Sequence, residues 1–267
     1  MAYAQPGPVD CSLLRLQDNH ISNQVWEAQE RIIRPSALVE RWRTETHTFH
    51  FPHGEATITL QDVALQLGLK IDGLSVTDFI TGDVRVAYHT LLGDTPRDKY
   101  VKGKMIYLTW LQQNFQQLPV DVDDIVIAQH ARAHMMIIIG GCLMPNTSGA
   151  KVHFMYLLLL SNLTEASHYS WGAAVLASLF RALDRAVKPD QTEIDGCLLL
   201  LQSWAWDRIK CITPKIDHLS MEEVQQGFGF PLARRWSRPR TEPNILTNSV
   251  RLIRIIFDKL HINVVHF

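Results

Sequence analysis

The sequence predicts a mainly α-helical fold, a single globular domain with one β-hairpin near residues 48–60. Several long segments repeat apolar residues with the 3.6-residue period of a helix, whereas strand-like alternation is confined to that hairpin region. The chain has 267 residues, of which 46% are hydrophobic, so it can bury a sizeable core. With only 14 Gly and 12 Pro, the composition does not suit a fibrous or disordered chain.

The β-hairpin is the first regular element expected along the chain. Residues 48–51 alternate between polar and apolar, a Pro-His-Gly-Glu loop follows, and residues 56–60 alternate again. A helix is expected directly afterwards. Thr59 and Asp62 can cap its start, and Gly68 suits the left-handed conformation that ends many helices.

Stripes of apolar residues predict the remaining helices. They cover residues 108–118, 125–142, 171–186, 194–209 and 252–260. The fourth of these segments is apolar nearly all round, which places it in the middle of the domain. Ser220 and Glu223 have the spacing of a capping box, so a short helix is expected before the last segment.

The net charge, the cysteines and the length of the apolar runs limit the classes of protein to which the chain can belong. The net charge is −1, which gives no general reason to expect nucleic acid, although the stretch from Pro231 to the end has seven basic residues against two acidic ones. The four cysteines form no CxxC pair, so reduced thiols in an intracellular compartment are expected. No signal peptide is expected at the N-terminus, and the apolar runs at residues 135–144 and 154–160 are shorter than the ~20 residues of a membrane span.

Several motifs resemble, in their order along the chain, those of one family. Residues 38–51 (LVERWRTETHTFHF), 54–64 (GEATITLQDVA) and 67–69 (LGL) resemble the signature of the plant mobile domain, also called the aminotransferase-like plant mobile domain. This family includes the maintenance-of-meristems proteins and long-form homologues of plant serine/threonine phosphatase 7. Further matches are Gly140-Gly141, Tyr169-Ser170-Trp171-Gly172, residues 196–202 with Trp204-Ala205-Trp206, and Pro231-Leu232-Ala233-Arg234-Arg235-Trp236.

The resemblance divides the chain into three parts. Residues 1–19 are an N-terminal tail, residues 20–236 resemble the plant mobile domain, and residues 237–267 form a basic linker and an atypical C-terminal helix. Family members usually carry a helical segment after the Arg-Pro found here at residues 34–35. This chain passes directly to the motif at Val39, so the internal segment is expected to be missing.

The resemblance also implies a function. Family members are nuclear, support transposable-element silencing, genome stability and meristem maintenance, and act partly through a phosphatase-like partner. We therefore expect a nuclear, non-enzymatic protein-interaction module with no cofactor and no membrane association. Two alternatives stay open: direct binding of nucleic acid through the basic C-terminal segment, and a cryptic enzyme of unknown reaction.

Specific catalytic and metal sites find little support in the residues. The lysines do not follow the strand patterns that would present an aldimine-forming lysine to a cofactor, and the metal-ligand motifs of phosphatases are missing from the sequence. His130 and His134 stand four apart on a predicted helix and are a weak candidate for a metal site. No third ligand is indicated nearby, so structural or surface histidines are the favoured interpretation.

Two groups of residues are candidates for binding macromolecules. The first comprises Arg234, Arg235, Trp236, Arg238 and Arg240, which could contact phosphates, act as a nuclear import signal or form a solvated linker. The second, a candidate for partner binding, comprises Glu40, Arg41, Trp42, Arg43 and Trp206. Trp206 is included because it points ~200° away from Trp204 on a helix, so the two cannot face the same neighbour.

Residues 59–69 resemble the first helix and turn of a DNA-reading helix-turn-helix. The second helix of such a motif would start near Ser75, yet residues 71–78 are acidic and rich in turn formers. A hairpin and helix packed on the core is the favoured interpretation.

Overall fold

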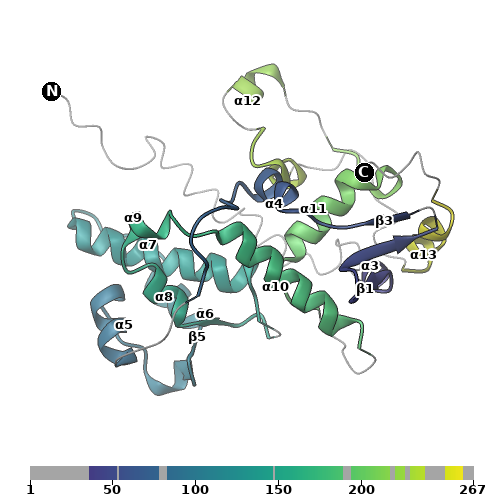
Figure 1. The fold of residues 1–267 in the computed structure, drawn as a ribbon. Helices are drawn as coiled ribbons and strands as arrows, with labels where there is room; N and C mark the ends of the chain where they lie inside the picture. The colour runs from purple at the N-terminus through teal and green to yellow at the C-terminus, as the bar shows by residue number, and fades with distance from the viewer. Residues whose placement is uncertain are drawn as a thin grey trace.

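The computed structural model confirms a mainly helical domain, which also contains two small antiparallel sheets (Figure 1). It describes residues 36–52, 54–77, 83–146, 148–188, 194–216, 220–225, 229–237 and 250–260. The predicted N-terminal tail and the position of the missing segment near Arg34-Pro35 lie outside these residues.

The first sheet contains the predicted hairpin. Its strands are β2 (Thr48–Phe51) and β3 (Gly54–Ala56), paired antiparallel, and β1 (Trp42–Arg43) adds a third strand that the sequence analysis missed. The second arm begins at Gly54, inside the predicted four-residue loop, because Gly54 and Glu55 already pair with Phe51 and His50. It ends at Ala56, earlier than predicted, because the chain then turns into helix α4 (Leu60–Leu67). Short helix α3 (Ser36–Val39) precedes the sheet.

The ends of α4 are formed as predicted. Thr59 and Asp62 make a reciprocal capping box, which satisfies backbone N–H groups at the start of the helix. Gly68 ends it with a φ of 68°, a left-handed conformation that glycine adopts without steric cost.

A second sheet was not predicted. It joins β4 (Val101–Lys102) and β5 (Met105–Tyr107) to β6 (Lys151–His153), with Ile106 opposite Val152. Strands of two or three residues are too short to show an alternating pattern. Around this sheet lie α5 (Val84–Leu92), η1 (Asp98–Tyr100), α6 (Leu108–Asn114), α7 (Asp124–Ile138), the π-helical turn η2 (Ile139–Leu143), α8 (Met155–Leu159) and α9 (Leu163–Ala166).

The remaining predicted helices are present. Helix α10 (Trp171–Ala186) has the predicted ends, whereas the ends of α11 (Leu198–Arg208) and α13 (Val250–Asp258) are shifted. The capped α12 (Met221–Gln225) and the short 3-10 helices η3 (Lys210–Ile212) and η4 (Leu232–Ser237) complete the set. The α11 helix begins later than the predicted start at residue 194. Gly196, at a φ of 84°, precedes it in a conformation that does not belong to a right-handed helix.

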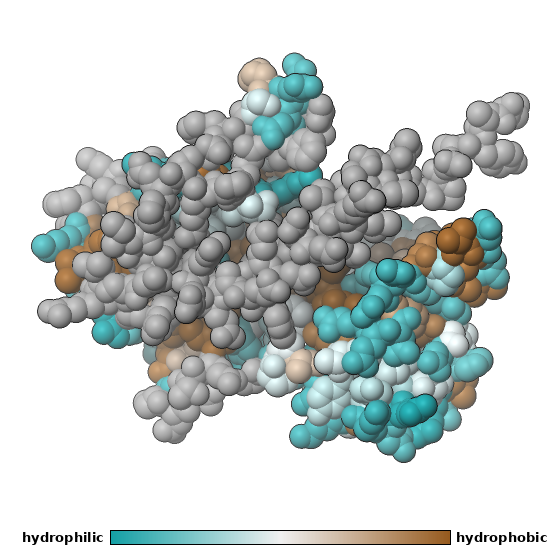
Figure 2. Space-filling model, turned by 180° about the vertical axis from the view of Figure 1, so that it is seen from behind, coloured by the Kyte–Doolittle hydropathy of each residue, from teal (hydrophilic) through white to brown (hydrophobic). Residues whose placement is uncertain are grey.

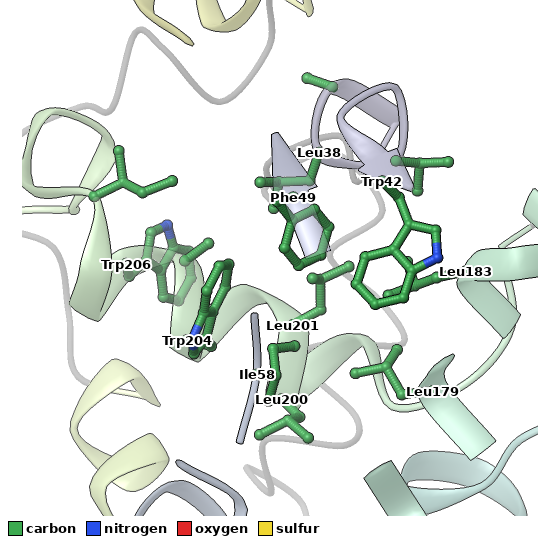
Figure 3. Close-up of a cluster of buried hydrophobic side chains, with 14 of the residues drawn as sticks. Leu38, Trp42, Phe49, Ile58, Leu179, Leu183, Leu200, Leu201, Trp204 and Trp206 are labelled. Atoms are coloured by element: carbon green, nitrogen blue, oxygen red, sulfur yellow. The ribbon is translucent and has the colours of Figure 1, made fainter. Parts of the chain in front are cut away.

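Two hydrophobic cores stabilise the domain. In the first, α11 packs against the hairpin sheet, α3, α10 and α13, and Trp204 lies on Phe49 with ring centroids 5.2 Å apart (Figure 3). The second core lies between α5, α6, α7, α8 and the second sheet. Helix α10 contributes to both, since Trp171 packs against the second core and Leu179 is buried in the first. The expected central position of α11 holds for the first core.

Helix α7 and the following π turn form one helical run, Asp124–Leu143, that is long and apolar enough by length and composition to cross a membrane. The expectation that no segment reaches this length is therefore corrected. The run contacts the second core through Ala133, Met136 and Ile139, but only 22% of its most apolar window is buried, and Ile125, Met135 and Ile138 are exposed. On the face seen in Figure 2, apolar surface gathers along the upper edge of the lobe at the right, above mostly hydrophilic surface.

The glycine pair in the π turn offers a matched test of packing. A Cβ at Gly140 would lie 2.5 Å from Cβ of Val152 on β6, whereas a Cβ at Gly141 would meet its nearest neighbour, Leu108, at 3.6 Å. We expect Gly140→Ala to lower the free energy of unfolding by about 1–3 kcal/mol through overpacking. Gly141→Ala should be neutral or stabilising by up to about 1 kcal/mol. Urea denaturation of the two variants compares them directly, and equal effects would contradict this account.

Candidate functional site

Three segments that carry the family motifs meet at one place in the fold. Helix α4, the last turn of α11 and η4 pack against each other, although they are far apart in the sequence. We call this place the α4–η4 junction and define it by Asp62, Gln66, Asp207, Arg208 and Arg235, together with the lining residues Leu65, Lys210 and Leu232.

Asp62 connects the start of α4 to the end of α11. One carboxylate oxygen accepts hydrogen bonds from the Thr59 backbone N–H and hydroxyl, both at 2.8 Å. The other oxygen accepts a hydrogen bond from the Arg208 guanidinium at 2.7 Å. Asp62 is only 7% exposed, so its charge is compensated within the fold, as a buried charge requires.

Asp207 connects α11 to both α4 and η4. Its carboxylate accepts hydrogen bonds from the side-chain amide of Gln66 and from the Arg235 guanidinium. Burial lowers the pKa of Arg235, but a guanidinium group in a protein stays charged at neutral pH. The Arg235 guanidinium also lies 4.7 Å from the centroid of the Trp236 ring, a cation–π contact.

A hollow of about 360 Å³ opens at the surface of this junction. It is lined by Asp62, Leu65, Gln66, Asp207, Arg208, Lys210 and Leu232. Leu65 is 52% exposed, and Phe230, which lies against Gly68 at the end of α4, is 53% exposed. Within the described part of the chain, the exposed Lys210 has no ion pair, and the buried Oε1 atom of Gln66 has no hydrogen-bond partner.

The basic C-terminal candidates fall into two groups. Arg234, Arg235 and Trp236 lie in η4, where Arg235 is paired with Asp207 and Trp236 packs on Trp206 with centroids 5.0 Å apart. Arg238 and Arg240 lie outside the described residues. Of the basic cluster, Arg235 therefore has a structural role that its sequence context did not indicate.

The candidates for partner binding are mostly engaged inside the domain. Trp206 is 5% exposed and covered by Trp236, and Trp42 is 5% exposed and donates a hydrogen bond to Asp184 at 2.8 Å. The two tryptophans are thus part of the core, which corrects the expectation that they anchor a partner at the surface. Arg43 is exposed.

Glu40 and Arg41 hold the C-terminal helix. Glu40 accepts two hydrogen bonds from the Arg254 guanidinium, and Arg41 pairs with Asp258. The hydrogen bond from Arg254 lowers the pKa of Glu40. The helix expected to be atypical therefore packs on the start of the domain, with Ile253, Phe257 and Leu260 buried in the first core.

His130 and His134 make contacts within their own helix. The Nδ1 atoms of His130 and His134 lie 3.0 and 2.9 Å from the backbone carbonyls one turn earlier, and the His130 ring packs edge-on against Phe115. Among the described residues, no group of three or more His, Cys, Asp or Glu side chains is arranged to hold a metal ion.

Comparisons with known proteins identify the family. A family model described as the plant mobile domain matches residues 25–267. The chain belongs to the plant mobile domain family. Residues Asp62, Asp207, Arg208 and Arg235 at the junction thus lie within a plant mobile domain, and the matched region includes helix α13.

Three relatives from Arabidopsis thaliana illustrate the family. Protein MAIN-LIKE 1 is 37% identical over 88% of this chain and 54% of its own length. Protein MAINTENANCE OF MERISTEMS is 38% identical over 75% of the chain and 40% of its own length. A serine/threonine-protein phosphatase 7 long form homolog is 34% identical over 86% of the chain and 21% of its own length. The chain thus spans about half or less of these relatives, and no solved structure matches it.

Sequence reasoning identified Asp62 as a helix cap but missed Gln66, Asp207, Arg208 and Lys210. For Asp207, the signal that could have found it is a charged residue next to an otherwise apolar motif. Asp207 directly follows Trp206 in a helix that is apolar nearly all round, so its carboxylate needs a partner from elsewhere in the fold.

Removing Arg235 tests whether the junction stabilises the fold. The side chain of Asp207 is only 20% exposed, so Arg235→Ala leaves a largely buried carboxylate without its guanidinium. We expect a loss of about 1–3 kcal/mol in the free energy of unfolding. Arg85→Ala is the matched control, because its ion pair with Asp98 is exposed (66% and 86%) and should contribute less than about 1 kcal/mol. Equal losses in chemical denaturation would refute a structural role for Arg235.

Cysteine reactivity provides a second test of this structure. Burial raises the pKa of the Cys142 thiol to about 11 and also raises that of Cys197, which is fully buried. At neutral pH both are protonated thiols, Cys197 buried and Cys142 half-buried. Burial also raises the pKa of the Cys211 thiol, but this residue is exposed to solvent. In a Cys11→Ser background, iodoacetamide should alkylate Cys211 at least about tenfold faster than the other two. Faster labelling of Cys142, detected by peptide mass spectrometry, would contradict the described packing.

Proposed function

We propose that this chain is a non-enzymatic protein-interaction module that acts in the nucleus. It works in transposable-element silencing, genome stability and meristem maintenance, through a phosphatase-like partner. The family supports this proposal: one relative is named for the maintenance of meristems and another for a serine/threonine-protein phosphatase.

The observation that carries the proposal is the surface of the α4–η4 junction. It combines a hollow lined in part by Leu65 with a second apolar side chain, Phe230, which lies outside the lining and close to Gly68 at the end of α4; both are more than half exposed. Exposed apolar residues around a concave site are typical of surfaces that bind another macromolecule.

The two carboxylates that line the hollow already accept hydrogen bonds from neighbouring segments of the fold. Asp62 accepts three hydrogen bonds from Thr59 and Arg208, and Asp207 is held by Gln66 and Arg235. A carboxylate that serves as a general base must be within reach of a substrate proton and have the capacity to accept it. Both carboxylates instead tie the three segments together, which favours binding over catalysis at this place.

Nucleic-acid binding is less favoured by the same contacts. If Arg235 contacted a phosphate, it would leave Asp207 without its guanidinium partner.

Affinity purification from plant nuclei, followed by mass spectrometry, tests the proposal. The wild-type chain should recover a protein with a phosphatase-like domain, and Leu65→Glu should reduce that recovery at least about tenfold by placing a charge on an apolar contact. Leu118→Glu is the matched control, since Leu118 has a similar exposure of 48% but does not line the hollow. Absence of any phosphatase-like protein from the wild-type sample would overturn the proposed function. Binding of nucleic acid with a steep dependence on salt would favour the alternative.

A further inference from the structure

We propose that the hollow at the α4–η4 junction binds a peptide segment of the partner that carries a large aliphatic side chain next to an acidic residue. This inference rests on the proposed function and specifies the chemistry of what the junction recognises. It follows from the apolar lining, the distribution of charge and one buried polar atom.

The apolar part of the hollow comes from α4 and η4. Leu65 and Leu232 both line it, and Leu65 is 52% exposed although Asp62 and Gln66 on the same helix are buried. A volume of about 360 Å³ is at the lower end of the range for pockets that enclose small ligands. It suits a single anchoring side chain with its adjoining backbone, inserted between the two leucines.

The charge of the lining favours a carboxylate on the peptide. Asp62 is paired with Arg208, and Asp207 is paired with Arg235. Lys210 lines the same hollow, is exposed, and has no ion pair among the residues that the structure describes. An acidic residue beside the aliphatic anchor would pair with Lys210, so the charges of the two surfaces would be complementary.

The side-chain oxygen of Gln66 is a hydrogen-bond acceptor that the backbone of a bound peptide could use. Gln66 is only 3% exposed and lines the hollow, and its amide N–H group is used by Asp207. Its Oε1 atom is buried and has no hydrogen-bond partner within the described ranges. A buried acceptor without a partner is unfavourable, and a peptide N–H could satisfy it on binding once the Gln66 side chain turns this oxygen toward the hollow.

Selection from a displayed library of random peptides, each about 16 residues long, tests this inference on the purified full chain. The enriched peptides should carry Asp or Glu close in sequence to Leu, Ile or Met. Against Lys210→Glu, the affinity of these peptides should fall at least about tenfold, and a new selection on that variant should enrich basic residues in place of acidic ones. Lys188→Glu is the matched control, because Lys188 is an exposed lysine that does not line the hollow.

Leu65→Gln is a second variant, which changes the apolar contact without adding charge. It should also lower the affinity of the selected peptides. Circular dichroism should show both variants folded, since the altered side chains are exposed. The inference is overturned if no peptide is enriched, if the enriched peptides are basic, or if acidic peptides bind both variants as well as the wild type. The proposed function is tested separately: it stands if nuclear purification recovers a phosphatase-like protein, even where the peptide selection fails.

Discussion

Ion pairs between two carboxylates, Asp62 (buried) and Asp207 (partly buried), and two guanidinium groups constrain the packing of the described domain. Asp62 and Arg208 are 146 residues apart in sequence, and Asp207 and Arg235 are 28 apart. Because a buried charge without a partner is strongly destabilising, these pairs constrain three segments to one arrangement. The apolar cores bring α4, α11 and η4 close, and the ion pairs fix which side chains meet.

The same principle acts at the other end of the first core, where the domain contacts its C-terminal helix. Glu40 binds Arg254 and Arg41 binds Asp258, at separations of 214 and 217 residues. These pairs are more exposed than those of the junction, so packing of α13 should depend mainly on Ile253, Phe257 and Leu260. Much of the motif that carries the family resemblance is thus used to position the chain's own elements.

Local patterns were sufficient to predict the hairpin, most helices and the capping box at Thr59, because each depends on residues within one or two turns. The second sheet was missed because β5 and β6 are separated in the sequence by α6, α7 and the π turn, and each strand has only three residues. The ion pairs of the junction were missed because they also join distant segments. A carboxylate in an apolar helix indicates that a cationic partner is needed, but the sequence around the carboxylate does not indicate which arginine is that partner.

The two tryptophans of α11 show how contacts between distant segments change a functional interpretation. Their directions on the helix imply that one of them must face away from the main core, which made Trp206 a candidate anchor. In the structure, Trp236 of η4 packs on the Trp206 ring and Phe49 packs on the Trp204 ring, so each of the two indoles is covered by another aromatic side chain. The same turn that buries Trp206 also brings Arg235 to Asp207, and the basic motif is thereby drawn into the fold. At the surface of this junction, Leu65 and Lys210 are exposed and Leu232 is half-buried. A protein surface with apolar and acidic groups therefore matches it better than a phosphate backbone.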